Sequence, residues 1–523
     1  MISPQGLSWF DAAIAAAYVA AILGLGVFTR RVGAGRGAKE YFLAGRSARW
    51  PMIGLSLVAS NISPTALVGV AGAAYATGVA VYNYEWIGAL VLLVFAVVFL
   101  PTVLRSGLYT MPEFLERRFD RRLRLWFSAL TLFMSIILDA AGVLYATTLF
   151  LRLLAPDMPA WFITSGLAGL AGLYVLTGGL RAVIYTEALQ AFVVLGGALL
   201  LTLYAVGAAG GITAILADAG PASLSLVRPA DDPHFPWTGL LFGAPLLGFY
   251  FWCTNQFMVQ RMLAARGIPD GQKGAVFGGL LKLTTLFVLV LPGLAAASLH
   301  ADLPQADLAY PTLVLSVLPP GLTGLVVAAF LGALMAQLSA AYSAAGVLFA
   351  MDFVKPRLAD PNEAGLIRWG RIGSFAALAV SAAWAPQIAR FESLWAYLQA
   401  VMAYLTPPMI AVFAAGFLLP RATTNGAVAA AVGGTLLGGG LFLGNATGAV
   451  DIHFLVVAGL LFATSLGLLL LVSAAGGFPR PPIETRTLLV QRRDLPLAFR
   501  DRTFALMALL LVGAIAVILT LLH

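Results

Sequence analysis

The stretch Gly54-Leu-Ser-Leu-Val-Ala-Ser-Asn-Ile-Ser-Pro64 decides the fold. It lies inside an apolar run over 51–79, and roughly 20 residues of helix are enough to cross the hydrocarbon core of a bilayer. Yet the middle of this run holds a cluster of short polar residues and a proline: Ser60, Asn61, Ser63, Pro64 and Thr65. Proline removes a backbone donor, and irregular backbone at membrane depth is tolerated only where it is buried in protein or lines a cavity. The stretch therefore predicts a transmembrane helix that is broken beside a cavity.

A second broken helix is expected at residues 236–260. There Pro245 and Gly248 precede the polar run Cys253-Thr254-Asn255-Gln256. Two interrupted helices at corresponding positions of successive halves are typical of transporters built from inverted repeats, whose substrate site lies near the breaks.

The composition indicates a protein that lies mostly within a membrane. Of its 523 residues, 60% are hydrophobic and 10% are charged, whereas a soluble domain has roughly 25% charged residues. The run over 309–351 is too long for one crossing, so its first part is expected to form a helix outside the membrane. The sequence predicts an all-α polytopic membrane protein with about 14 transmembrane helices, near residues 8–29, 51–79, 82–104, 126–151, 159–177, 183–206, 236–260, 275–299, 309–351, 370–388, 393–419, 424–444, 452–476 and 503–522.

The basic residues predict the orientation of these helices. With fourteen spans and both termini outside, the loops on the cytoplasmic side hold all of the 31 lysines and arginines except Arg152, Arg228, Lys282 and Arg390. Cytoplasmic loops of membrane proteins carry such an excess of positive charge. We therefore expect a multi-pass protein of the cytoplasmic (inner) membrane, and we assign the net charge of +8 to these loops rather than to nucleic-acid binding.

Motifs for other classes of function are missing from the sequence. It has no glycine-rich nucleotide-binding motif and no Ser/His/Asp or paired-carboxylate arrangement, so we expect neither an enzyme nor an ATPase. The single cysteine, Cys253, cannot form an intramolecular disulfide or a cysteine metal cluster. No cofactor is expected beyond a coupling ion.

The ionisable residues Glu85, Asp139, Glu187 and Lys282 lie within the expected spans. Such residues are costly in a bilayer and often mark a transport pathway. Lys282 lies about eight residues, or roughly 12 Å, into its helix, which is deeper than a lysine that reaches back to the interface. Each also has a structural interpretation: an ion pair for Lys282, exposure at a helix end for Glu85, and pairing with polar neighbours for Asp139 and Glu187.

Several motifs together resemble the solute:sodium symporter family over roughly residues 38–430. They are Tyr41-Phe-Leu-Ala-Gly-Arg-Ser47, Ser60-Asn-Ile-Ser63, Thr110-Met-Pro-Glu-Phe-Leu-Glu-Arg-Arg118, Thr177-Gly-Gly-Leu180 and Gly426-Ala427. The sodium/glucose branch is the most similar, on the evidence of Tyr84-Glu85-Trp86, Trp252-Cys-Thr-Asn-Gln256, Val259-Gln-Arg261, Leu281-Lys282-Leu283, Tyr397-Leu-Gln399 and Thr406-Pro-Pro408.

The resemblance implies a fold of the leucine-transporter type, with two inverted repeats of five helices. One extra transmembrane helix would lie in residues 1–30, the ten-helix core with its two broken helices in 51–420, and three more helices in 421–523. The implied function is secondary active transport of a sugar or sugar-like polyol by alternating access, with sodium as the coupling ion of the family.

The resemblance also implies a substrate site. It would consist of Glu85, Lys282, Gln399, Trp252, Phe251 and Asn61. A polyol needs convergent donors and acceptors, and Glu accepts, Lys donates and Gln does both. Trp252 could pack against the C–H face of a sugar. Phe251, Gly248 and Ala66 stand where related proteins often have polar residues, so the particular substrate stays open.

The ion site implied by the resemblance is only partly matched. Its carbonyl positions are Ala59, Ile62 and Ala333, but its two serines are replaced by Ala336 and Gln337. Hard cations need oxygen ligands, and Gln337 supplies one amide oxygen in place of two hydroxyls. Sodium at Ala59, Ile62, Ala333 and Gln337 is therefore one hypothesis.

The alternatives differ in the ion or in the solute. A carrier of the same fold could be uncoupled, or coupled to a proton on Glu187 or Asp139; Glu187 stands where the family commonly has an aspartate associated with sodium exit. A sodium symporter of an organic acid or amino acid would pair the substrate carboxylate with Lys282. A substrate sensor that does not transport is a further alternative, from a different class of protein.

Overall fold

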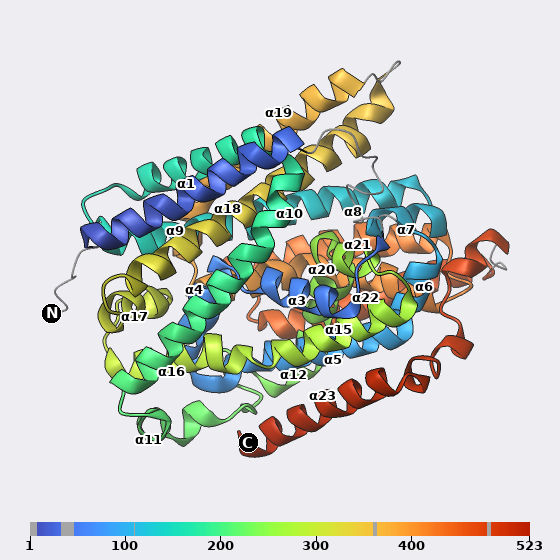
Figure 1. Cartoon of the computed structure of the whole chain (residues 1–523). Coiled ribbons are helices and arrows are strands. Elements are labelled where there is room, and N and C mark those ends of the chain that lie inside the picture. The colour runs from blue at the N-terminus through green and yellow to red at the C-terminus, as the bar shows by residue number, and fades with distance from the viewer. Residues whose placement is uncertain (1–7, 33–45, 109, 359–362, 479–482, 523) are drawn as a thin grey trace.

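The computed structural model describes residues 8–32, 46–108, 110–358, 363–478 and 483–522, apart from the side chains at 23, 25–32, 59, 174–192, 363–364 and 483–484. Across these ranges the chain is helical, and the described residues form no strand beyond two isolated β-bridges (Figure 1). The α-helices are α1 (Trp9–Val32), α3 (Trp50–Asn61), α4 (Pro64–Thr77), α5 (Asn83–Val94), α6 (Leu100–Arg105), α7 (Met111–Arg118), α8 (Arg121–Met134), α9 (Ala141–Leu154), α10 (Ala160–Ala208), α11 (Ile212–Leu224), α12 (Trp237–Phe242), α13 (Ala244–Phe249), α14 (Gln256–Leu263), α15 (Ile268–Lys282), α16 (Leu291–Leu299), α17 (Ala309–Val317), α18 (Leu322–Leu348), α19 (Glu363–Trp384), α20 (Leu394–Leu418), α21 (Thr424–Ala446), α22 (Phe454–Ala475) and α23 (Arg502–Leu521).

Short π-helical segments join several of these helices into longer ones. They are η3 (Phe95–Phe99), η4 (Ser135–Ala140), η5 (Tyr250–Thr254), η6 (Leu286–Val290) and η8 (Phe349–Val354). Such wide turns are rare in proteins as a whole, but where they occur they often lie at functional sites. The segment η4 lies between α8 and α9, and η5 directly precedes the second helix break.

Both predicted helix breaks are present. The first separates α3, which ends at Asn61, from α4, which begins at Pro64. There the Oγ atom of Ser63 accepts the backbone N–H of Ala66 at 3.2 Å and caps α4. The second lies at Asn255, whose extended backbone ends η5 and whose Oδ1 atom caps α14.

The described residues include nine helical segments that are long and apolar enough to cross a membrane. The count becomes ten if Val193–Ala208 and Ile212–Leu224, bent by 86°, are taken as one span. This confirms a multi-pass helical protein, while the count of fourteen stays a prediction. Two details bear on that count. The helical backbone of α10 covers both spans expected at 159–177 and 183–206, and α11 is a helix that the sequence did not predict.

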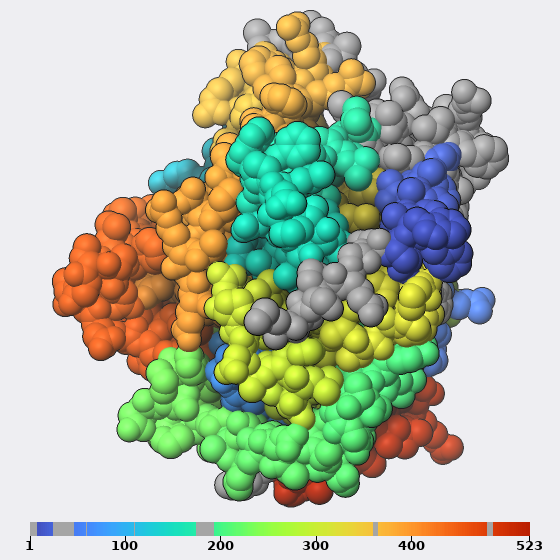
Figure 2. Space-filling view, turned by 90° about the vertical axis from the view of Figure 1, so that its left-hand side faces the viewer, coloured from blue at the N-terminus to red at the C-terminus, as the bar shows by residue number. Residues whose placement is uncertain are grey.

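The long apolar run over 309–351 divides as expected. The short helix α17 ends at Val317, and a turn leads into α18 through Gly321, whose φ of 92° favours glycine. Residues 300–317, called here the cap segment, cross the end of the bundle that also carries α11, and Figure 2 looks onto this end. Within the cap segment, Asp307 accepts the backbone N–H of Leu394 at 2.8 Å. The cap segment is thus attached to the first turn of α20.

Close contact between α3 and α15 positions the interior side chains. A Cβ atom at Gly274 would lie 2.6 Å from Cβ of Ile53, and one at Gly54 would lie 2.5 Å from the Phe277 ring. Helices in membranes often approach each other through such small residues. Because α15 also packs on α5, the last turn of α15 and the first turn of α5 meet in the interior.

Candidate functional site

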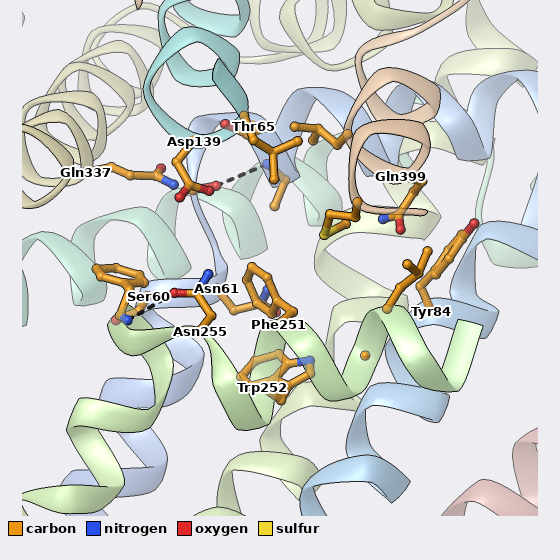
Figure 3. A pocket seen from close by; sticks show the side chains of 18 of the residues that line it. Ser60, Asn61, Thr65, Tyr84, Asp139, Phe251, Trp252, Asn255, Gln337 and Gln399 are labelled. Carbon is orange, nitrogen blue, oxygen red and sulfur yellow. Dashed lines mark hydrogen bonds between the residues drawn. The ribbon is translucent and has the colours of Figure 1, made fainter. Parts of the chain in front are cut away.

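A cavity of about 140 Å³ lies between the two helix breaks (Figure 3). It has room for a small solute rather than for a single water molecule. Residues from α3, α4, α5, η4, α13, η5, α14, α15, α18 and α20 line it. Its polar lining residues are Ser60, Asn61, Ser63, Thr65, Tyr84, Glu85, Ser135, Asp139, Trp252, Asn255, Lys282, Gln337, Trp395 and Gln399.

A buried ion pair lies in the wall of this cavity. Nζ of Lys282 donates to Oε2 of Glu85 at 2.5 Å and to Oδ1 of Asn61 at 3.2 Å. The two charged side chains are only 2% and 4% exposed. The hydroxyl of Thr285 donates to the same carboxylate oxygen at 3.0 Å. Because a buried charge is stable only when it is paired and hydrogen-bonded, Glu85 and Lys282 depend on each other.

A glycine allows this pair to form beside an aromatic ring. A Cβ atom at Gly88, one turn after Glu85, would lie 2.8 Å from Cε of Lys282 and 2.9 Å from Nε1 of Trp252. With glycine there, Nζ of Lys282 lies 4.7 Å from the centroid of the Trp252 ring, a cation–π distance. Phe251 packs edge-on against Trp252, with 5.2 Å between the ring centroids, and both rings line the cavity.

Gln399 brings polar atoms to the cavity from α20. Its side chain is 4% exposed, and its Oε1 atom is buried without a hydrogen-bond partner in the described part of the chain. The hydroxyl of Tyr84 and Nε1 of Trp395 share this condition, and both residues line the cavity. A buried polar atom without a partner costs free energy. This wall is thus suited to a solute that brings hydroxyl groups.

The first helix break changes the hydrogen bonding of the backbone at the predicted ion ligands. In an unbroken helix, the carbonyl of Ala59 would accept the N–H of Ser63, and that of Ile62 would accept the N–H of Ala66. Here the N–H of Ser63 donates to the carbonyl of Asn61, and the N–H of Ala66 donates to the Oγ atom of Ser63. The carbonyls of Ala59 and Ile62 have thus lost their helical donors.

The remaining predicted ion ligands lie on α18. Gln337 lines the cavity, and its Oε1 atom is buried without a partner among the described residues. Ala333 lies one turn earlier on the same helix, while Ala336 and Ser339 do not line the cavity. Relative to two serine hydroxyls, α18 therefore presents one amide oxygen.

Of the two predicted titrating groups, the structure describes the side chain of Asp139 only. Asp139 is half-buried in η4 and lines the cavity. The side chain of Glu187 lies outside the described side chains, as does Thr177-Gly-Gly-Leu180, and most of Tyr41–Ser47 lies outside the described residues. The role of Glu187 stays a prediction.

Sequence reasoning missed Gly88, Thr285 and Trp395, and it included Thr65 in the polar cluster of the first break without assigning it to the site. Thr285 lies three residues after Lys282, so helical spacing could have placed it on the same face. Gly88 and Trp395 gave no such signal, because their importance depends on which neighbouring helix faces them.

Comparison with known proteins places these features in a family. The model of the sodium:solute symporter family matches residues 41–434. Sodium/glucose cotransporter 2 of Rattus norvegicus is 34% identical over 480 residues, which are 82% of this chain and 70% of that protein. The sodium/glucose cotransporter of Vibrio parahaemolyticus is 33% identical over 454 residues, covering 81% and 83%. Sodium/myo-inositol cotransporter 2 of Mus musculus is 34% identical over 468 residues, covering 82% and 69%.

Solved structures show the same fold. The structure of a Na⁺-coupled sialic acid symporter in a substrate-bound outward-open state matches with a TM-score of 0.72 at 20% identity, covering 90% of this chain and 98% of that one. A nucleobase-cation-symport-1 family transporter in a closed conformation matches with a TM-score of 0.54 at 13% identity, covering 84% and 97%. By its sequence match and its relatives, this chain belongs to the sodium:solute symporter family and is a multi-pass membrane transporter rather than an enzyme.

Proposed function

We propose that this chain carries a neutral sugar or a sugar-like polyol together with sodium across the cytoplasmic membrane by alternating access. The observation that carries the proposal is the convergence of the Glu85–Lys282 pair, the unpartnered amide oxygen of Gln399 and the ring of Trp252 on one cavity. A polyol can bridge such donors and acceptors, and it can lay a C–H face on the indole. Relatives named for glucose and for myo-inositol support this class of substrate.

Electrostatics favour a neutral solute over an acid. An organic acid or amino acid would need the ammonium group of Lys282 for its carboxylate. Glu85 already holds that ammonium group at 2.5 Å in a buried position, and separating a buried pair is costly. A neutral polyol can bind while the pair stays intact, and Phe251 and Asn61 would complete its site.

Sodium is the proposed coupling ion, held beside the first helix break. The carbonyls of Ala59 and Ile62, which have lost their helical donors, would bind it together with the carbonyl of Ala333 and Oε1 of Gln337. The carboxyl-terminal end of a half-helix suits a cation because its carbonyls carry partial negative charge. Proton coupling is the second candidate, because Ala336 and Gln337 stand in place of two hydroxyl groups.

Uptake into proteoliposomes tests the proposal. A panel of labelled sugars and polyols should include one whose accumulation rises with an inward sodium gradient. Uptake that follows only a pH gradient would establish the proton-coupled alternative. Absence of both uptake and counterflow, with binding retained, would instead indicate a substrate sensor.

The proposal includes a topology of fourteen spans, with one helix in 1–30, a five-plus-five inverted-repeat core in 51–420, three helices in 421–523 and both termini outside. Figure 1 shows that α1 begins and α23 ends toward the end that carries the cap segment, while α6 and α7 lie at the opposite end. That opposite end carries Arg105, Arg117 and Arg118, so the positive-inside rule directs it to the cytoplasm. A reporter fused to the C-terminus should be periplasmic, and one inserted in the loop 480–502 should be cytoplasmic; the reverse result would contradict the topology.

A further inference from the structure

The cavity holds a carboxylate that the substrate site does not use. Asp139 lies in the π-helical segment η4 and lines the cavity beside residues from α4 and α18. Its counterpart Glu85 is neutralised by Lys282, whereas no ion pair of Asp139 is found among the described residues. A side chain of this kind inside a membrane protein marks a place where a cation or a proton can bind.

A second observation indicates a ligand at the same place. The side chain of Thr65 is 7% exposed, lines the cavity, and has an Oγ1 atom without a hydrogen-bond partner in the described part of the chain. A Cβ atom at Gly142 would lie 3.8 Å from this Oγ1 atom. Gly142 follows Asp139 by three residues, close to one helical turn. Thr65 therefore packs against the stretch of helix that carries Asp139.

A third oxygen comes from the opposite helix. The helix α18 packs against η4, and Oε1 of Gln337 is buried, unpartnered among the described residues and part of the cavity lining. Figure 3 shows Asp139, Thr65 and Gln337 at one end of the cavity, away from Gln399 and Tyr84. This end of the cavity thus offers three kinds of oxygen: a carboxylate, an amide oxygen and a hydroxyl oxygen. The amide oxygen of Gln337 and the hydroxyl oxygen of Thr65 have no hydrogen-bond partner among the described residues.

We infer that Asp139, Thr65 and Gln337 form the side-chain half of a site for a sodium ion, opposite the carbonyls that end α3. This inference rests on the proposed sodium symport and names the residues that replace the two missing hydroxyls. Oxygen ligands suit a hard monovalent cation, and a carboxylate supplies the full charge that two serines lack. The carboxyl-terminal end of α3 attracts the cation, because its carbonyl groups carry partial negative charge.

Equilibrium binding of radioactive sodium to the purified protein, with sodium chloride alone, tests the inference. Asp139→Asn should abolish saturable binding. Thr65→Val, which keeps the shape and removes the oxygen, should weaken sodium binding at least tenfold, as expected for one ligand to a charged group. Thr65→Ser, which keeps the oxygen, should bind sodium within a few-fold of the unmodified protein.

The outcomes separate this inference from the proposed function. If the unmodified protein binds sodium and couples it to sugar uptake while Asp139→Asn and Thr65→Val retain full sodium affinity, the inference is wrong and the proposed function stands. If the unmodified protein shows no sodium binding and its uptake follows pH, both fail. The Thr65 variants keep the test decisive should Asp139→Asn fail to fold.

Discussion

Neutralising Lys282 should destabilise the protein far more than neutralising a partly exposed lysine of the same helix. In Lys282→Met, the carboxylate of Glu85 stays 4% exposed but loses its ammonium partner at 2.5 Å. Leaving one partner of a buried pair without its counter-charge costs about 3–5 kcal/mol. We therefore expect the free energy of unfolding to fall by about that amount.

The chain offers a matched control on α15. Lys273 pairs with Asp501 at 2.8 Å, with side chains 18% and 32% exposed, and ion pairs that solvent reaches contribute much less than buried ones, about 0.2–1 kcal/mol when fully exposed. Reversible denaturation in mixed detergent micelles should therefore show a small effect for Lys273→Met. The double variant Lys282→Met with Glu85→Gln should recover most of the lost stability, because no buried charge remains.

Substrate binding separates stability from function in this series. The double variant should be stable yet bind the transported sugar poorly, because it has lost a donor and an ionised acceptor. If Lys282→Met lowers the free energy of unfolding no more than Lys273→Met does, the charge of Glu85 does not depend on Lys282 as its burial implies. If the double variant binds sugar normally, the pair is structural and the proposed site is wrong.

Three further perturbations follow from the geometry. Gln399→Ala should weaken sugar binding by about 1–3 kcal/mol, the cost of one hydrogen bond and a stranded partner, and unchanged KM would contradict the proposed site. Gly88→Ala should raise KM, because its Cβ atom would fall 2.8 Å from Lys282 and 2.9 Å from Trp252; normal transport would show that these side chains can move apart freely. Burial raises the pKa of Asp307 in the cap segment from 3.8 to about 6, so the docked cap segment binds a proton more tightly than an undocked one. The resulting stabilisation is present below about pH 4 and is lost as the pH rises through about 6; Asp307→Asn should flatten this part of the curve of melting temperature against pH, and an unchanged curve would refute the assignment.

The sequence predicted the helix breaks because their signals are local. Proline at position 64 and the cluster of short polar side chains before it act within one or two turns of backbone, so no knowledge of neighbouring helices was needed. The depth of Lys282 likewise predicted an ion pair with a buried carboxylate as one interpretation, and the structure provides Glu85.

Other features depend on contacts between helices that are far apart in the sequence. The closeness of Gly88 to Lys282 and Trp252 becomes visible only when α5, η5 and α15 are assembled. The same holds for Thr65 and Asp139, whose neighbourhood depends on how α4 packs against α9. The number of spans stays a prediction, because α10 covers two expected spans with one helix and α11 was not expected.

Because the charges lining the cavity do not cancel, the membrane potential should act differently on the empty and on the loaded carrier. Its charged lining residues within the described structure are Glu85, Lys282 and Asp139; the first two cancel, so an ionised Asp139 leaves the empty cavity with one net negative charge. A bound sodium ion and a neutral sugar would bring the filled cavity to zero. Moving one elementary charge through 100 mV is worth about 2.3 kcal/mol. In a cell with a negative interior, the voltage would therefore act on the empty carrier and drive its cavity back toward the outer side, while the loaded carrier would cross almost unaffected.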